Sequence, residues 1–363
     1  MTMFFGLASA VMFGLLDLLI ARSSKTVGIM YTIVFAHGAA ACILVLYLFT
    51  HASSMSIGLP SGDIPILLWV GAGLGMVSCL TNLSLYQGLS FGPMALISPV
   101  TASYGLITIV LAILFLHEIP SPATSVIFVA MIGGIILATG AGSNEGTIRS
   151  SPRLSRTMMI FIVMALALSL LTGSLLFFLL GWLEVPSWLV IFWSVCVTIC
   201  ILLAGSFSLV PLFIRYQWLA RQKQQLGLLF GVGAMLGFGS EYFLLSLTTA
   251  HLGPIAPVAV SRLGSTLLLF AYARHQRVEG WGDIKLKHVS GMVLIGLLDV
   301  LGTIFYNMGS AQSTVLVATL SSTYPLLPLL VGIFWYRERI SPIQWGGISI
   351  LVLGMAVLPL LRT

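Results

Sequence analysis

The stretch SYGLITIVLAILFLHEIPSP, residues 103–122, has a counterpart 220 residues further on, TYPLLPLLVGIFWYRERISP, residues 323–342. Each copy is a long apolar run that ends in a glutamate and a Ser-Pro pair. Tyrosine, glutamate and proline are scarce in this chain, so matches at these residue types carry more weight than matches between leucines. The shared residues are Tyr104 and Tyr324, Glu118 and Glu338, and Ser121-Pro122 and Ser341-Pro342. We therefore infer an internal duplication.

The duplication extends on both sides of this stretch. The same shift of 220 pairs Gly71 with Gly291, Tyr86 with Tyr306, and Gly134 with Gly354. Nearer the start, a shift of 225 pairs Phe13-Gly14 with Phe238-Gly239, Gly28 with Gly253, and His37 with Arg262. The matching units are therefore residues 1–141 and 226–361.

Composition places these units in a membrane. The 363 residues are 58% hydrophobic and only 7% charged, whereas soluble domains have about 25% charged residues. A helix needs roughly 20 apolar residues to cross a bilayer, and the chain predicts about twelve such helices. We expect them at 3–20, 27–49, 64–85, 93–116, 123–141, 157–181, 187–212, 226–247, 253–273, 288–309, 313–335 and 343–361.

The predicted fold is an all-α integral membrane protein with two five-helix repeats. The first repeat is 1–141 and the second is 226–363. Residues 142–225 form a linker and an additional two-helix hairpin, 157–212. An odd number of helices inserts successive copies in opposite orientations, and a hairpin of two preserves that parity. Inverted repeats of this kind can rock around a site near the bilayer midplane and so give alternating access.

Basic residues orient the predicted helices. The net charge is +6, but nucleic-acid binding requires a basic face outside the bilayer, and we exclude it. Breaks after odd-numbered helices hold fourteen lysines and arginines, whereas the other side holds only Arg362. Because positively charged loops remain in the cytoplasm, we expect both termini outside, in a bacterial cytoplasmic (inner) membrane.

Three stretches resemble EamA-type members of the drug/metabolite transporter superfamily. Residues 92–99 (GPMALISP), continuing to 117–122 (HEIPSP), resemble that family's fourth helix and the turn after it. Residues 322–325 and 337–342 resemble the same element, and residues 6–28 are similar to its first helix. The resemblance implies a ten-helix core around a central cavity that carries small organic solutes. The additional hairpin and the outward termini depart from that pattern.

Ionisable side chains within the predicted spans are candidates for a solute or ion-coupling site, because placing them in a bilayer is costly. We expect Arg262 to pair with Glu241, with Asp299 or with an anionic group of the solute. In the first repeat, Asp17 and His37 would have a similar role in ion pairing or solute binding. A carboxylate and an imidazole at this depth can also relay a proton. The alternative is an internal ion pair that only holds helices together.

Other polar residues could line the same cavity. Tyr86, Tyr104, Tyr306 and Tyr324 recur in both copies, and tyrosine offers a ring face and a hydroxyl; interfacial or packing roles are the alternative. Asn307 is a further binding candidate, although a hydrogen bond between helices is the alternative for it.

Pro99 and Pro325 fall inside predicted helices, where proline permits a kink that can act in gating. Glu118 and Glu338 lie at helix ends, where a carboxylate can bond the first amides of the next helix, and we expect them to be structural caps.

These patterns favour secondary active transport of a small organic metabolite. The family resemblance implies an amino acid, a related metabolite or a drug-like solute, and export as the direction, with uptake as the alternative. We expect no enzyme activity, no catalytic residues, no bound cofactor and no metal site; the partners are the lipid bilayer, the solute and a coupling proton or ion. No Walker-type phosphate loop is present in the sequence, which disfavours direct use of ATP. Two alternatives remain: a membrane-embedded enzyme acting on a lipid-linked substrate, and a non-transporting sensor or scaffold. The sequence leaves the oligomeric state open.

Overall fold

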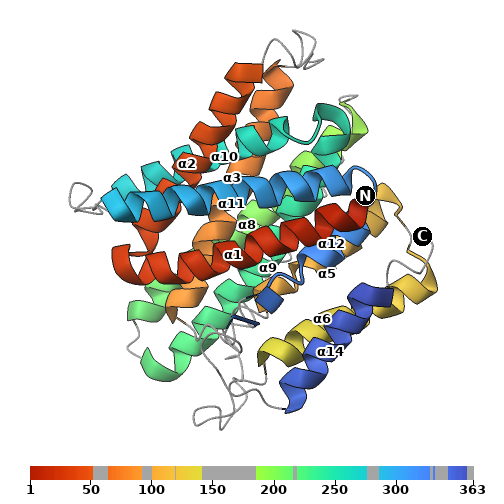
Figure 1. Cartoon of the computed structure of the whole chain (residues 1–363). Helices are drawn as coiled ribbons and strands as arrows, with labels where there is room; N and C mark the ends of the chain where they lie inside the picture. Colours follow the sequence, from red (N-terminus) through yellow and green to blue (C-terminus); the bar gives the residue numbers. More distant parts are fainter. Residues whose placement is uncertain are drawn as a thin grey trace. The chain divides into compact units, whose positions relative to one another are not determined.

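The computed structural model describes residues 1–51, 64–91, 100–118, 120–140, 185–215, 219–275, 286–327, 330–331 and 342–357. Throughout these residues the regular structure is helical (Figure 1). The α-helices are α1 (Thr2–Val27), α2 (Ile29–His51), α3 (Ile64–Phe91), α5 (Tyr104–Leu111), α6 (Pro122–Gly140), α8 (Ser187–Arg215), α9 (Leu219–Leu252), α10 (Ala256–His275), α11 (Leu286–Ser310), α12 (Thr314–Ser321) and α14 (Pro342–Val357). A π-helical turn, η1 (Ala112–Leu116), continues α5.

Seven of the described helices are long and apolar enough to cross a bilayer. Large apolar side chains such as Leu68, Val126 and Leu267 are exposed on the helix surfaces, as expected where lipid is the solvent. The chain is therefore an all-α integral membrane protein. Of the predicted central hairpin, the second helix corresponds to α8, and the first lies outside the described residues.

The chain divides into two compact units, and each takes helices from both sequence repeats. Unit 1 comprises Met1–Cys79 and Leu244–Pro328, and unit 2 comprises Leu80–Phe243 and Leu329–Thr363. Two of the three unit boundaries fall inside long helices, α3 and α9, which therefore contribute to both units.

In unit 1, α1 packs against α11 and α12, and α2 packs against α10 and α11 (Figure 1). Small residues allow this close approach, as is usual between membrane helices. Phe13 covers Gly302, and Phe5 lies near Gly309, so α1 and α11 run in opposite directions.

The contact between α3 and α10 is closer still. A side chain at Gly75 would collide with the backbone of Gly264, since its Cβ would lie 2.7 Å from the Gly264 Cα. One turn earlier, Gly71 faces Val260. Contacts that advance together along both helices mean that α3 and α10 run in the same direction.

In unit 2, α6 packs against α14, and α9 packs against α5 and α3. The Thr108 hydroxyl donates a hydrogen bond to the Gly239 carbonyl at 2.8 Å. A Cβ on Gly239 would lie 2.5 Å from the Ile107 Cβ and 2.8 Å from the Tyr104 carbonyl oxygen. The glycine is therefore required for the approach of α9 to α5.

Two turns between helices use glycine for its backbone freedom. Gly28, between α1 and α2, has φ 98°, and Gly253, after α9, has φ 74°. Side chains rarely adopt this left-handed region. The two glycines are the pair related by the shift of 225 residues.

Candidate functional site

A buried ion pair joins α10 and α11 inside unit 1. The Nε atom of Arg262 lies 2.7 Å from Oδ2 of Asp299, and Nη2 donates to Oδ1 at 3.0 Å. This is the two-point arrangement that a guanidinium forms with a carboxylate. The Arg262 side chain is 5% exposed and that of Asp299 is 17% exposed, so the carboxylate is the more accessible partner.

Two hydroxyl groups complete the surroundings of the guanidinium. Nη1 donates to Ser78 Oγ on α3 at 3.0 Å, and Nη2 donates to Thr303 Oγ1 on α11 at 3.1 Å. The Thr303 hydroxyl donates its own hydrogen bond to the backbone carbonyl of Asp299 at 2.8 Å. Its oxygen is therefore available to accept the hydrogen bond from Arg262. Three helices thus hold the guanidinium in place.

His37 approaches the pair from α2. Its Nδ1 lies 3.2 Å from the Ile33 carbonyl oxygen; because a carbonyl only accepts, Nδ1 carries the proton and Nε2 is an acceptor. Nε2 is buried and has no hydrogen-bond partner among the described residues. The backbone of α2 at Ala36 and Ala40, on either side of His37, lies against Gly296 of α11, three residues before Asp299. We call Arg262, Asp299, Ser78, Thr303 and His37 the Arg262 cluster.

The arrangement explains how an apolar protein tolerates an arginine in a span. Removing an ion from water costs several kcal/mol, and a buried pair is tolerated only with good geometry and further hydrogen bonds. Both conditions hold here. The sequence offered two carboxylates as partners of Arg262, and the structure pairs it with Asp299, while Glu241 is buried in the other unit.

The remaining predicted site residues are divided between the units. Asp17 is half-buried on α1, the helix that packs against α11. The Asn307 side chain donates to the Pro254 carbonyl at 3.0 Å, which ties α11 to the turn before α10. Unit 1 contains Asp17, His37, Arg262, Asp299, Tyr306, Asn307 and Tyr324, and unit 2 contains Tyr86, Tyr104 and Glu241.

An aromatic group surrounds Tyr104 in unit 2. Its ring centroid lies 5.0 Å from that of Tyr242 and 6.4 Å from that of Phe238. Both partners lie on α9, on either side of Glu241 in the sequence. Sequence reasoning selected Tyr104 by its recurrence and missed its two partners, whose spacing of four residues places them on one face of a helix.

The structure differs from the sequence-based expectation around Pro325. The predicted helix 313–335 is interrupted: α12 ends at Ser321, and residues 322–325 form a turn. There the amides of Thr323 and Tyr324 bond three residues back, to Leu320 and Ser321, and Pro325 has no N–H to donate. Pro99 and Glu338 lie outside the described residues.

The start of α6 is capped by Ser121. Its Oγ accepts from the Thr124 amide at 3.2 Å, as an N-cap serine does. Glu118 follows η1 and donates its backbone amide to the Ala112 carbonyl at 3.4 Å; a capping role for its side chain stays a prediction.

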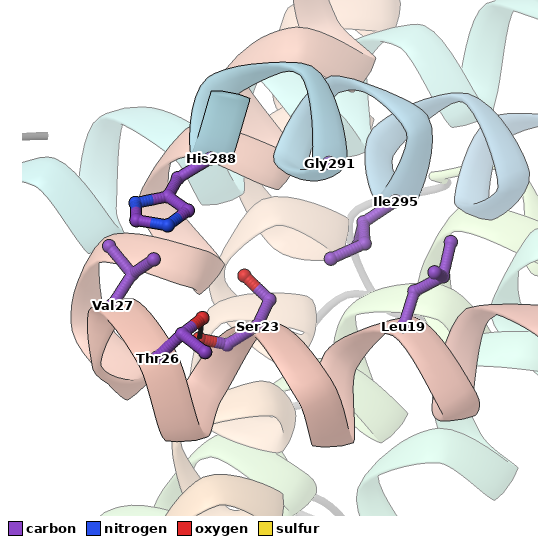
Figure 2. Close-up of a pocket in the computed structure, with 7 residues that line it drawn as sticks. All are labelled: Leu19, Ser23, Thr26, Val27, His288, Gly291 and Ile295. Carbon is purple, nitrogen blue, oxygen red and sulfur yellow. Dashed lines mark hydrogen bonds between the residues drawn. The ribbon is translucent and has the colours of Figure 1, made fainter. Parts of the chain in front are cut away.

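A pocket of about 390 Å³ lies between the end of α1 and the start of α11. Figure 2 shows Leu19, Ser23, Thr26 and Val27 on one helix facing His288, Gly291 and Ile295 on the other. Thr26 donates to the Ser23 carbonyl at 3.0 Å, and the Ser23 and Thr32 hydroxyls lie 3.1 Å apart. Ile295 precedes Asp299 by one helical turn, so the α11 residues that line the pocket share a helix face with Asp299.

Ser78 and Thr303 were not predicted as site residues. Both are small polar residues of a kind common throughout the apolar helices. One signal was available for Thr303, since it follows Asp299 by four residues and therefore shares its helix face. Ser78 carries no such signal, because its contact with Arg262 spans 184 residues of sequence.

The sequence model of a family described as the EamA-like transporter family matches residues 1–140 and 225–359. The resemblance inferred from residues 92–122 and 322–342 is thereby confirmed. None of the curated proteins compared matches the chain. Six solved chains do match. One of them, titled only "Crystal structure of protein", aligns with 99% of this chain and 96% of its own, at 13% sequence identity and a TM-score of 0.65. That likeness shows the fold alone.

Proposed function

Since the chain belongs to the EamA-like transporter family, we propose that it is a secondary active transporter that moves a small organic metabolite by alternating access. The family is one of membrane transporters, which supports this function over the alternatives of a membrane-embedded enzyme or a scaffold. The finer proposal is export of an amino acid, a related metabolite or a drug-like solute across a bacterial cytoplasmic membrane.

Helix directions within unit 1 support inverted repeats. Consecutive spans run in opposite directions, so α2 and α3 are antiparallel. The contacts of Gly71 with Val260 and of Gly75 with Gly264 make α3 and α10 parallel. It follows that α10 runs against α2, its counterpart in the first repeat. We therefore propose a ten-helix core of two inverted repeats, extended to twelve helices by the hairpin 157–212, with both termini outside.

The observation that carries the functional proposal is the buried Arg262–Asp299 pair. Arginine or aspartate at the centre of a membrane helix costs about 2.5–3.5 kcal/mol on insertion scales, and such residues usually mark solute or ion pathways. Here the pair, two hydroxyls and an imidazole converge from α2, α3, α10 and α11. We propose that the Arg262 cluster binds the solute or its coupling ion.

Further residues have proposed roles along the same pathway. We assign solute contact or ion coupling to Asp17, Tyr86, Tyr104, Glu241, Tyr306, Asn307 and Tyr324. We assign gating to the chain at Pro99 and Pro325.

A proteoliposome flux assay with a metabolite panel tests this function. Wild-type protein should move at least one solute, and Arg262→Gln should abolish that flux while Arg262→Lys retains part of it. Arg274→Gln is the matched control, because Arg274 is exposed at the end of the same helix. Thermal unfolding must show that each variant is folded. Absence of flux for every solute, or full flux by folded Arg262→Gln, would contradict the proposal.

A further inference from the structure

We propose that a proton and a carboxylate bind together at the Arg262 cluster: the proton neutralises Asp299, and the carboxylate of the solute takes its place on Arg262. The inference rests on the proposed transport function and adds two things to it, the chemical class of the solute and the sign of the coupling. The solute and the proton help one another to bind instead of competing.

The geometry of the pair favours a carboxylate. Asp299 occupies the edge of the guanidinium formed by Nε and Nη2, at 2.7 and 3.0 Å. Any carboxylate that reaches this edge can make the same two contacts, because the planar fork of arginine matches that group. Ser78 and Thr303 remain on the other donors and keep the guanidinium oriented.

Charge balance requires the proton. The resting pair is neutral, and a solute whose only charge is its carboxylate would leave one negative charge uncompensated in a buried place, which is strongly unfavourable. Protonation of Asp299 removes that charge and weakens its hold on Arg262. No covalent bond changes: one proton from solution binds to Asp299 as one carboxylate binds to Arg262.

The elements around Asp299 contain few groups that could compensate instead. Those packed against α11 are α1, α2, α10 and α12, and α3 joins through Ser78. Apart from tyrosines and the groups near helix ends, such as Arg274 and His275, the titratable residues on these helices are Asp17 on α1, His37 and Cys42 on α2, Arg262 on α10 and Cys79 on α3; α12 has none. Only His37 has an acceptor nitrogen that is buried and without a hydrogen-bond partner among the described residues. We assign it the passage of the proton to Asp299.

The pocket in Figure 2 provides the approach. Its residues on α11, His288, Gly291 and Ile295, form one stripe of the helix that continues to Asp299. Its volume, about 390 Å³, lies within the range of roughly 300–1,000 Å³ typical of small-molecule sites. A solute on this path meets Asp299 first, the more exposed member of the pair.

The sign of the coupling follows from linkage. If proton binding strengthens carboxylate binding, carboxylate binding strengthens proton binding by the same factor. Proton and solute then cross in the same direction. An exporter working in this way is driven by the outward gradient of its solute, and each solute takes a proton with it.

Calorimetry on the purified full chain in lipid nanodiscs tests the inference. The probes are benzoate and lactate, each with its methyl ester as a neutral match. We expect at least one carboxylate to bind and its ester to bind far more weakly. Titrations in two buffers of different ionisation enthalpy should show proton uptake on binding. Where Asp299 is ionised, affinity should fall about tenfold for each pH unit.

Two variants locate the proton. In Asp299→Asn, a permanently neutral side chain, binding should become independent of pH and take up no proton. Arg262→Gln/Asp299→Asn leaves no charge at the pair and should fold but bind no carboxylate. Proton release on binding, equal binding of esters, absence of binding by every carboxylate, or unchanged proton uptake in Asp299→Asn would each overturn the inference.

The same experiments separate the inference from the function. Flux of solutes that have no carboxylate would preserve the transporter and overturn the carboxylate site. Absence of all flux, with intact carboxylate binding and proton uptake, would overturn the transport function.

Discussion

The two units use the same packing contact but contain different chemistry. In unit 1, Gly14 of α1 lies against Leu327 and the Tyr324 carbonyl; in unit 2, Gly239 of α9 lies against Ile107 and the Tyr104 carbonyl. Shifts of 225 and 220 residues convert one set into the other. The duplicated sequence has therefore kept its helix contacts.

The ion pair does not follow the duplication. The counterpart of Arg262 is His37, and the counterpart of Asp299 under the shift of 220 is Cys79. Close helix packing tolerates little change, because a single added methyl group collides with backbone. Side chains that face the polar interior are free to diverge. The comparison indicates that the helix contact recurs in both units, whereas the ion pair found among the described residues belongs to unit 1.

The largest effect should come from breaking the ion pair. Asp299→Ala leaves Arg262 buried without its counter-ion and should lower the free energy of unfolding by about 3–5 kcal/mol. Cys79→Ala, at the related position, should cost only about 1 kcal/mol. Chemical unfolding in detergent measures both. Equal losses of stability in the two variants would show that the ion pair contributes no more to stability than the related position in the first repeat.

Steric substitution tests the shared contact. Gly14→Ala and Gly239→Ala would each place a Cβ within 2.8 Å of a carbonyl oxygen, and each should cost about 1–3 kcal/mol by overpacking. Gly133→Ala is the control, since nothing lies within 4 Å of the added Cβ. If only one of the two substitutions lowered the stability, the contacts of Gly14 and Gly239 would not be equivalent.

Substituting either turn glycine should lower the stability by a similar amount, and by less than the substitutions at Gly14 and Gly239. Gly28→Ala and Gly253→Ala force a side chain into the left-handed region at φ 98° and 74°, at a cost of about 1–2 kcal/mol each. Thermal unfolding midpoints measured side by side would check this. A stabilised variant would show that the turn can relax to negative φ.

The smallest effect concerns a bond found in unit 2. Thr108→Val removes the hydrogen bond to the Gly239 carbonyl while preserving shape, and should cost about 1 kcal/mol. The related position in the sequence is Pro328, which has no hydroxyl. Thr101→Val, which alters another buried threonine before the same helix, provides a comparison. A loss no greater than that of Thr101→Val would assign the bond no special weight.

The sequence predicted helices well because the signal for them is local. Runs of apolar residues longer than a bilayer crossing can be read without any partner, and α1, α2, α10 and α11 lie where such runs predict them. The interruption after Ser321 was missed, since Pro325 was read as a kink inside one continuous helix. The structure resolves it as a turn with tightened hydrogen bonds.

Within the candidate site, the sequence alone identified only the ionisable residues, whose placement in a membrane span costs free energy. Arg262 and Asp299 stood out because charge within a span is rare, but the choice between Asp299 and Glu241 depends on which helices pack together. Ser78 and Thr303 look like many other small polar residues, and only their distances from the guanidinium distinguish them. Both the carboxylate partner of Arg262 and the hydroxyls around it depend on tertiary packing, which cannot be predicted from a local sequence pattern.

The combination of helices from both sequence repeats in one unit has a consequence for synthesis. The α1 helix ends at Val27, whereas its partner α11 begins at Leu286, about 260 residues later. At about 5–20 residues per second of translation, α1 waits tens of seconds in the membrane before its packing face is covered. Arg262 likewise precedes Asp299 by 37 residues, so the arginine must be held for several seconds before its carboxylate arrives. Insertion of this chain therefore requires that Arg262 on α10 be stabilised by other groups until Asp299 has been synthesised.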